Sequence, residues 1–294
     1  MKILILGASG MLGHTLFFEF LYNKNFDVWG TVRSIFEVDK YFPNAMLNRV
    51  IENVDANNID SVEAIIIKLK PDIVINCIGI IKQLPISKEA IPVITLNSLF
   101  PHHVASICKD NGCRMIHIST DCVFDGLKGS YTEDDKLSAD DLYGISKYMG
   151  EVKYDHTITI RTSIIGHELC FNYSLIEWFL SQSDSINGFT NAIYTGFPTV
   201  EIANIIVDYV LPNENLSGLY HVSSEAISKY ELLKIVSEVY GKRIDIIPYD
   251  DYFDNKSLVS EQFKECTGYN PPGWDKLIKK MYNNYKQFGY KRNI

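Results

Sequence analysis

The sequence predicts an α/β protein with a doubly wound parallel sheet and a smaller C-terminal lobe. Through the first half of the chain, apolar runs rich in Ile and Val alternate with helical patterns. Such alternation is typical of right-handed β-α-β units, whose strands are buried on both faces. The 294 residues are enough for one large α/β unit or two smaller ones.

The first half supplies five buried strands and four helices. The strands are expected at the apolar runs KILILG, FDVWGTV, DIVINCIG, RMIHIST and TITIRTS, each bounded by turn residues. The helices are expected at residues 11–22, 59–69, 92–111 and 142–152, where the apolar positions follow helical spacing.

The second half is less regular. SLIEWFLSQ and TVEIANIIVDYVL have helical patterns, INGFTNAIYTGFP reads as short strands and loops, and GLYHVS reads as one more buried strand. SKYELLKIVSEVYG predicts a helix that ends at Gly241, because glycine adopts the left-handed conformation of a helix C-cap. We expect a nucleotide-binding domain over residues 1–163 and about 196–222, with the lobe over about 164–195 and 223–294.

Composition excludes several classes of function. The net charge of −8 argues against a nucleic-acid or anionic-membrane surface, which needs clustered Lys and Arg. We expect no membrane span, because no apolar run approaches the ~20 residues that one requires. We also expect no signal peptide. Six cysteines without paired metal-type spacing predict reduced thiols in a cytoplasmic protein, and no catalytic metal is expected.

A glycine-rich turn joins the first strand to the first helix. Gly7, Gly10 and Gly13 form G-x-x-G-x-x-G, in which glycine permits a tight turn and a close backbone approach to a pyrophosphate. Amides at the helix N-terminus favour negative charge. We therefore predict a Rossmann-type dinucleotide site. Its expected members in the turn are Gly7, Ser9, Gly10, Met11, Leu12 and Gly13.

The end of the second strand predicts the cofactor. An acid here usually binds the ribose 2′-hydroxyl of NAD, whereas an arginine accommodates the 2′-phosphate of NADP. Arg33 occupies this place, with Thr31 as an extra donor, so NADP(H) is predicted. The alternative is that Arg33 is a solvated surface charge. Asp55 follows the third strand and is predicted to contact adenine or, alternatively, to be an acid in a surface turn.

Three residues have the chemistry for proton transfer to a ketone. Tyr143 and Lys147 are one helical turn apart and share a face. A nearby ammonium lowers the pKa of a phenol by stabilising the phenolate. Thr120 follows the strand RMIHIST, at the edge of the sheet where ligands bind. Its hydroxyl can donate to a carbonyl oxygen that Tyr143 protonates.

Taken together, these motifs resemble the extended short-chain dehydrogenase/reductases over nearly the whole chain. The shared motifs are the glycine loop, NCIG (which contains Cys77, Ile78 and Gly79), Asn97 in TLNSLFP, ISTD and YGISK. The resemblance implies that Tyr143 is the general acid, Lys147 its tuning partner, and Thr120 the catalytic hydroxyl. It also implies that Asn97 holds a helix kink or a proton-relay water. In this family Cys77, Ile78, Gly79, Tyr143 and Lys147 also contact the cofactor.

Within the family, STDCVFDGLKGSYTEDD followed by YGISKYMGE is most similar to dTDP-4-dehydrorhamnose reductases. This resemblance implies NADPH-dependent reduction of the 4-keto group of a dTDP- or UDP-linked 6-deoxy sugar, in the synthesis of bacterial surface polysaccharide precursors. The expected substrate contacts are Thr120, Asp121, Cys122, Lys82, Arg161 and Asn191. Each of three residues has an alternative role. Lys82 could instead contact a protein partner, and Arg161 could form a structural salt bridge. Asn191 could belong to an aromatic core.

Alternative functions within the same fold remain open. The sugar dehydratases of the family carry Thr-Asp-Glu where this chain has Thr-Asp-Cys, so dehydration is not expected. A nucleotide-sugar epimerase and a non-catalytic, NADP-binding regulatory subunit remain as alternatives. The family's habit of dimerising implies a homodimer.

Overall fold

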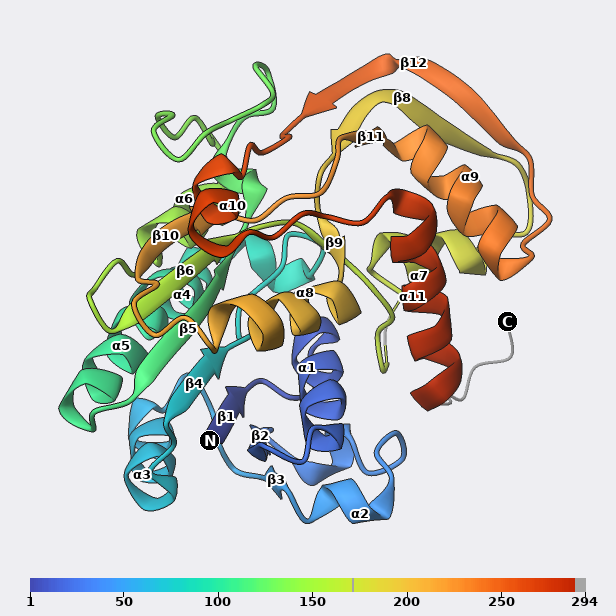
Figure 1. Ribbon diagram of the computed structural model, residues 1–294. Helices are drawn as coiled ribbons and strands as arrows, with labels where there is room; N and C mark the ends of the chain where they lie inside the picture. Colours follow the sequence, from blue (N-terminus) through green and yellow to red (C-terminus); the bar gives the residue numbers. More distant parts are fainter. Residues whose placement is uncertain (171, 289–294) are drawn as a thin grey trace. The chain divides into compact units, whose positions relative to one another are not determined.

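The computed structural model describes residues 1–170 and 172–288. The chain divides into two compact units (Figure 1). The first comprises residues 1–120, 140–160 and 214–219, and the second comprises 121–139, 161–213 and 220–294. The domains predicted from the sequence differ from these units, because they assign residues 121–139 and 196–213 to the sheet domain. The predicted domain bounds stay a prediction.

The first unit carries a seven-stranded sheet with the order β10-β6-β5-β4-β1-β2-β3. The strand pairs β1–β2, β1–β4, β2–β3 and β4–β5 are parallel, which confirms the predicted doubly wound α/β class. The strands are β1 (Lys2–Leu6), β2 (Asp27–Thr31), β3 (Val50–Ile51), β4 (Ile73–Asn76), β5 (Arg114–Ser119), β6 (Thr157–Arg161) and β10 (Gly218–His221). The ends of β6 and β10 fall in the second unit.

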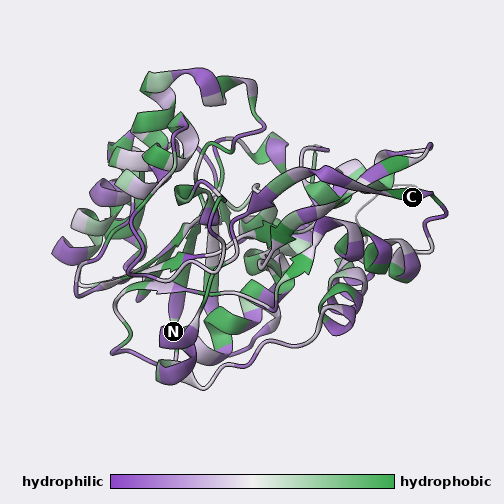
Figure 2. Ribbon diagram, turned by 90° about the horizontal axis from the view of Figure 1, so that it is seen from above, coloured by the Kyte–Doolittle hydropathy of each residue, from purple (hydrophilic) through white to green (hydrophobic). Residues whose placement is uncertain are grey.

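The helical segments of the first unit connect these strands. They are α1 (Met11–Tyr22), η1 (Ile35–Glu37), α2 (Asn44–Leu47), α3 (Ile59–Leu69), η2 (Pro85–Lys88), α4 (Ala90–Ile94), η3 (Thr95–Leu99), α5 (Phe100–Asp110) and α6 (Leu142–Met149). The bounds of α1 and α3 match the predicted helices. In Figure 2, hydrophilic and hydrophobic residues alternate along the helices, as expected for helices that bury one face.

Alternate residues of the strands face opposite sides of the sheet. Leu4 and Leu6 of β1 belong to a buried cluster with residues of α3 and α5. On the neighbouring strand, Gly30 lies against the Phe17 ring of α1, and a Cβ at this glycine would come within 3.0 Å of that ring. The glycine on β2 therefore allows α1 to pack closely against the sheet.

The predicted helix over residues 92–111 is interrupted. It forms α4, the π-helical turn η3 and α5 in succession. A π turn inserts one residue into the helical ladder and is frequent at functional sites. The predicted single helix is thus correct in extent but wrong in regularity.

The second unit contains the remaining elements. Its helical segments are η4 (Asp121–Val123), α7 (Leu175–Ser181), α8 (Thr199–Ile205), η5 (Ile206–Val210), α9 (Lys229–Tyr240), α10 (Glu261–Thr267) and α11 (Trp274–Phe288). Its strands are β7 (Ile164–Ile165), β8 (Ile186–Tyr194), β9 (Phe197–Pro198), β11 (Ile227–Ser228) and β12 (Ile246–Asn255). As predicted, Gly241 ends α9 in the left-handed conformation, with φ 66°.

A long strand pair dominates the second unit. β8 runs for nine residues and pairs in parallel with β12, so the two strands lie side by side in Figure 1. The reading of INGFTNAIYTGFP as short strands and loops was therefore wrong for residues 186–194. The Asn, Thr and Gly residues of β8 weaken the sequence pattern of a strand. The strand is instead stabilised by its pairing with β12.

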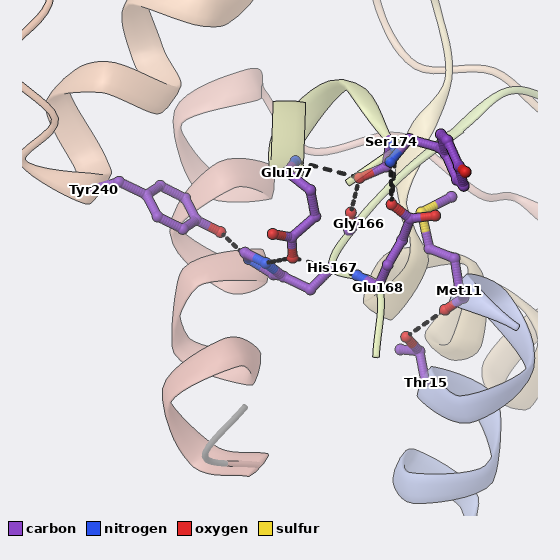
Figure 3. Close-up of polar contacts among 9 residues, drawn as sticks. Met11, Thr15, Gly166, His167, Glu168, Ser174, Glu177 and Tyr240 are labelled. Atoms are coloured by element: carbon purple, nitrogen blue, oxygen red, sulfur yellow. Dashed lines mark hydrogen bonds and ion pairs between the residues drawn. The ribbon is translucent and has the colours of Figure 1, made fainter. Parts of the chain in front are cut away.

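A buried polar network lies in the second unit (Figure 3). His167 Nδ1 lies 2.9 Å from Glu177 Oε1, and its Nε2 lies 2.8 Å from the Tyr240 hydroxyl. Glu177 is also the third residue of a helix start, where its backbone amide donates to Ser174 Oγ. The network connects α7 and α9 through His167, which precedes both helices.

None of the helices in the described part of the chain is long and apolar enough to cross a membrane.

Candidate active site

The glycine loop is shaped by close backbone approaches. Gly7 has φ +85°, a conformation that favours glycine. A Cβ on Gly13 would overlap the Gly7 carbonyl oxygen, so this position must be glycine for α1 to start where it does. Gly10, the N-cap of α1, is exposed, and a Cβ there would have only an ordinary 3.5 Å contact. Its side of the loop is therefore open to a ligand.

The neighbouring strand β2 holds this loop in place. Thr31, at the end of β2, is buried and accepts a hydrogen bond from the Gly7 amide at 3.2 Å. The Ala8 amide donates to the Thr31 carbonyl oxygen at 2.9 Å. Thr31 thus has a structural role in addition to the cofactor contact predicted for it.

The NCIG segment lies against the same loop. Cys77 follows β4, and its amide donates to the Leu6 carbonyl oxygen at 3.1 Å. A Cβ on Gly7 would come within 2.8 Å of the Ile78 side chain. A Cβ on Gly79 would lie 3.2 Å from Asn97 Oδ1 and 3.9 Å from Lys147 Nζ. The structure therefore places the NCIG segment between the glycine loop and Lys147.

Arg33 is paired with an acid that the sequence analysis did not consider. Its guanidinium lies 3.2 Å from Glu37 and is 70% exposed. The Glu37 carboxylate also accepts a hydrogen bond from Ser9 Oγ of the glycine loop at 3.0 Å. Arg33, Glu37 and Ser9 thus form a chain of contacts from the end of β2 to the glycine loop.

Asp55 shapes its own turn. Its carboxylate accepts hydrogen bonds from the backbone and side-chain nitrogens of Asn57, at 2.9 and 3.1 Å. Its amide donates to Ser61 Oγ at 3.1 Å. These contacts match the surface-turn alternative, and the adenine contact stays a prediction.

Helix α6 carries the tyrosine and the lysine, and both of its ends are fixed. At the N-cap, the Asp141 side chain accepts a hydrogen bond from the Gly144 amide at 2.7 Å. At the other end, Gly150 packs so closely on the Asn97 carbonyl oxygen that a Cβ would overlap it. Tyr143 is half-buried and Lys147 is buried, so the face they share points inward.

Lys147 is held at the end of β5. Its Nζ donates to the Ile118 carbonyl oxygen at 2.8 Å, two residues before Thr120, which is also buried. Burial lowers the pKa of Lys147 from 10.5 to about 8, against the opposing attraction of Glu151 and Cys77. The lysine therefore remains mostly protonated at neutral pH.

Asn97 lies in the π-helical turn η3. Its side-chain oxygen accepts from the Ile80 amide at 2.8 Å, and its Nδ2 donates to the Ile80 carbonyl oxygen at 3.0 Å. Nδ2 also lies 3.3 Å from Ser146 Oγ on α6. Asn97 thus contacts both the segment after NCIG and helix α6, and it lies at the irregular turn of its own helix.

Lys82 lies close to helix α6, where it has a structural partner. Its ammonium lies 2.5 Å from the carboxylate of Asp141, the N-cap of α6. Lys82 is 58% exposed at the side chain. The substrate contact predicted for it stays a prediction.

Arg161 is deeply buried in the second unit. Its Nη1 lies 2.9 Å from His221 Nε2, and its guanidinium lies over the Phe124 ring. Burial, helped by the positive charge of Arg161, lowers the pKa of His221 to about 3, so this histidine is neutral. These contacts give Arg161 a structural role, and the substrate contact predicted for it stays a prediction.

The other candidate substrate contacts of the second unit are dispersed. Asp121 and Cys122 form the turn η4, in which Asp121 is buried and Cys122 half-buried. Asn191 is exposed on β8 and donates to the Asp250 carbonyl oxygen of β12 at 2.8 Å. Among the residues that the structure describes, no group of three or more His, Cys, Asp or Glu side chains could hold a metal ion.

Sequence reasoning missed two charged residues at the site. Glu37 contacts both Arg33 and Ser9, and Glu151 accepts a hydrogen bond from Ser119. Each acid follows a predicted site residue by four positions, a spacing that places side chains on one helical face. That spacing was the signal that could have identified both.

The loop geometry fits a dinucleotide. Helix α1 has no side-chain cap at its N-terminus and no acid in its first turn, so no side chain of that turn repels a phosphate there. The exposed Gly10 leaves room for one. The residues that would hold the cofactor are thus the glycine loop, Arg33 and the NCIG segment.

Comparison with known proteins identifies the family. The family model described as RmlD substrate binding domain matches residues 1–287. A dTDP-4-dehydrorhamnose reductase of Aggregatibacter actinomycetemcomitans is 25% identical over 95% of this chain and 98% of its own length. Methionine adenosyltransferase 2 subunit beta of Danio rerio is 24% identical over 82% of this chain and 74% of its own.

Solved structures agree on the fold. The crystal structure of dTDP-4-dehydrorhamnose reductase from Bacillus anthracis in complex with NADP has a TM-score of 0.77 and 20% identity, covering 96% of this chain and 97% of its own. The family model and these relatives confirm the resemblance to dTDP-4-dehydrorhamnose reductases that was read from the motifs. Because the family model spans nearly its whole length, this chain belongs to the RmlD substrate-binding-domain family.

Proposed function

We propose that this chain is an NADP-dependent oxidoreductase that reduces the 4-keto group of a nucleotide-linked 6-deoxy sugar. The observation that carries the proposal is the position of Lys147, buried on the helix of Tyr143 with its ammonium on the strand that ends before Thr120. The same compact unit contains the glycine loop. The predicted enzyme class and the predicted cofactor agree with the reductases among its relatives.

The chain's own residues bind the cofactor and supply the proton. Bound NADPH supplies the hydride that reduces a ketone. The α1 amides and the glycine loop would accommodate its pyrophosphate, and we assign Arg33 to the 2′-phosphate. Lys147, next to Gly79 and Asn97, is placed to reach the ribose hydroxyls of the nicotinamide half.

Tyr143 is the proposed general acid. Its phenol gives a proton to the ketone oxygen, so the C=O bond becomes a C–OH group, and the phenolate then takes a proton from solvent. A free phenol is a poor acid–base group at neutral pH, and an ammonium one helical turn away, as on Lys147, stabilises the phenolate. Thr120 donates a hydrogen bond to the same oxygen and stabilises its developing negative charge.

We propose a dTDP- or UDP-linked sugar as the substrate, used in the synthesis of surface polysaccharide precursors. The names of the relatives and the STD…YGISK pattern support this class. Asp121 and Cys122 follow Thr120 directly, so they are the nearest candidates for sugar contacts. Cys122 replaces the glutamate of the dehydratases, which favours net reduction.

We also propose a homodimer, on the basis of an apolar surface in the first unit. Large hydrophobic side chains are exposed on α4, η3 and α6, which pack together. They include Ile91, at 82% exposed, with Ile94, Leu99, Ile145, Tyr148 and Met149. Exposed apolar patches of this kind mark protein interfaces, and a second copy of the chain would bury it. Sedimentation velocity of Ile91→Glu against the parent chain tests this assignment.

A subunit without turnover is the second candidate, because relatives include subunit beta of methionine adenosyltransferase 2. That reading predicts cofactor binding without reduction of a sugar. A nucleotide-sugar epimerase, the remaining alternative, would leave the amount of cofactor unchanged over the full cycle.

One assay separates these functions. The chain is mixed with NADPH and a panel of dTDP- and UDP-linked 4-keto-6-deoxy sugars, and absorbance at the nicotinamide band is followed with product analysis. We expect one NADPH consumed for each 4-hydroxyl formed, and at least a hundredfold loss with Tyr143→Phe. NADPH binding without consumption across the panel would instead support the subunit reading.

A further inference from the structure

A buried carboxylate lies behind the catalytic pair. Glu151 follows α6 and is 7% exposed. Its Oε1 accepts a hydrogen bond from Ser119 Oγ at 2.8 Å. Ser119 is the last residue of β5 and directly precedes Thr120. The carboxylate therefore connects the end of the catalytic helix to the strand that carries the catalytic hydroxyl.

Glu151 and Lys147 hold two consecutive residues of β5. The Lys147 ammonium donates to the Ile118 carbonyl oxygen, and Ser119 donates to Glu151. The two charged residues are four positions apart. This double attachment fixes the position of Lys147 relative to the strand end.

The titratable side chains around Lys147 come from several elements. Cys77 lies near it from the segment after β4, His117 from β5 and Glu151 from the segment after α6, and Tyr143 precedes it by four residues on α6. Burial raises the pKa of the Cys77 thiol to about 12, and burial lowers the pKa of His117 well below its ordinary value. Cys77 and His117 are thus uncharged at neutral pH.

We propose that Glu151, held by Ser119, is a positioning residue that keeps the buried Lys147 protonated and in place at the end of β5. Its negative charge opposes the burial that favours a neutral amine. Without it, the amine loses its proton at a lower pH, and the phenol of Tyr143 loses its cationic neighbour. The role in catalysis rests on the proposed function, whereas the effect on Lys147 itself does not.

The first test is a titration that needs no substrate. Lysine is labelled with ¹³C at Cε, and the Lys147 signal is assigned by its absence in Lys147→Arg. In Glu151→Gln, which keeps an oxygen to accept from Ser119, we expect the titration midpoint of Lys147 to fall by about one pH unit or more, a tenfold loss in proton affinity. Glu151→Asp, which keeps the charge, should restore most of it. Glu63→Gln, the same exchange on the exposed face of α3, should leave the midpoint unchanged.

The second test measures the pH dependence of turnover. In Glu151→Gln the alkaline limb of kcat/KM should move to lower pH by the same amount, with kcat at low pH retained. Ser119→Ala keeps the charge but removes its anchor, so it provides a second variant if Glu151→Gln does not fold. We expect it to lower the midpoint by less than Glu151→Gln does. An unchanged Lys147 midpoint in both variants would overturn the proposal. A shifted midpoint in a chain that turns over no sugar would instead refute only the proposed substrate.

Discussion

Arg33 lies 3.2 Å from Glu37, four residues further along the chain, and the same carboxylate is bonded to Ser9 of the glycine loop. An arginine at this place favours the 2′-phosphate of NADP, whereas an acid favours the 2′-hydroxyl of NAD. The chain has both, in contact with each other. Cofactor preference therefore depends on how strongly Glu37 neutralises Arg33.

The two residues are expected to shift the preference in opposite directions. Arg33→Ala should weaken NADPH binding by about tenfold or more, since a charged hydrogen bond contributes ~1.5–3 kcal/mol, and should leave NADH binding nearly unchanged. Glu37→Gln should strengthen NADPH binding and weaken NADH binding. Calorimetric titration with each nucleotide measures both effects. Arg49→Ala, which removes another ion-paired arginine of the first unit, is the matched control. Equal losses for both nucleotides in Arg33→Ala would contradict the assignment.

Substitutions of two glycines in the first loop are expected to affect different properties, one the stability and the other the binding of the cofactor. Gly13→Ala would overlap the Gly7 carbonyl oxygen, so it should lower the free energy of unfolding by roughly 1–3 kcal/mol or more. Gly10→Ala has room within the protein and should leave stability nearly unchanged, but its methyl group would enter the space of the pyrophosphate.

Thermal unfolding and NADPH titration of the two variants separate these effects. Gly273→Ala, at a glycine with nothing within 4 Å of an added Cβ, controls for the substitution itself. A Gly10→Ala protein that binds NADPH like the parent would show that the pyrophosphate does not lie over this residue.

Much of the first unit could be predicted because its signals are local. The helices at 11–22 and 59–69 agree with the structure at both ends, because a glycine loop and a regular apolar spacing define them. The π turn at Asn97 could not be predicted, because it accompanies hydrogen bonds to Ile80, seventeen residues away. The long strand β8 depends in the same way on its pairing with β12.

The candidate catalytic residues could be selected from motifs, but their surroundings could not. Tyr143 and Lys147 are in one motif, whereas the bonds of Lys147 to Ile118 and of Glu151 to Ser119 join segments about thirty residues apart. Arg161 shows the same limit more clearly. The family resemblance implied a substrate contact for it, whereas its contact with His221, sixty residues further along the chain, could not be predicted from the sequence.

The His167 network is expected to stabilise the second unit. Tyr240→Phe removes the hydroxyl 2.8 Å from His167 Nε2 and leaves a buried ring nitrogen without that partner, at a cost of about 1–3 kcal/mol. Urea unfolding followed by tyrosine fluorescence measures the change. Tyr249→Phe, at an exposed tyrosine of β12, should have an effect below about 0.5 kcal/mol. Equal effects of the two substitutions would mean that the network contributes little.

The buried Lys147 is expected to lower the free energy of unfolding of the folded chain. Its pKa is about 8 in the folded chain and 10.5 in the ordinary state, so between these pH values the unfolded chain binds more protons. The stability therefore rises with pH across this window, and the cost of burying the ammonium is fully present below pH 8.

Replacing Lys147 with methionine should remove that cost together with the activity. At pH 7 we expect Lys147→Met to be more stable than the parent chain by about 1–3 kcal/mol, since each pKa unit corresponds to ~1.4 kcal/mol and the loss of the bond to Ile118 offsets part of the gain. The difference should shrink as the pH approaches 10.5. Urea unfolding of both proteins at pH 7 and pH 10 measures this change, with Lys68→Met on the exposed face of α3 as the control. A variant that is less stable than the parent at both pH values would show that the hydrogen bond to β5 outweighs the cost of burial.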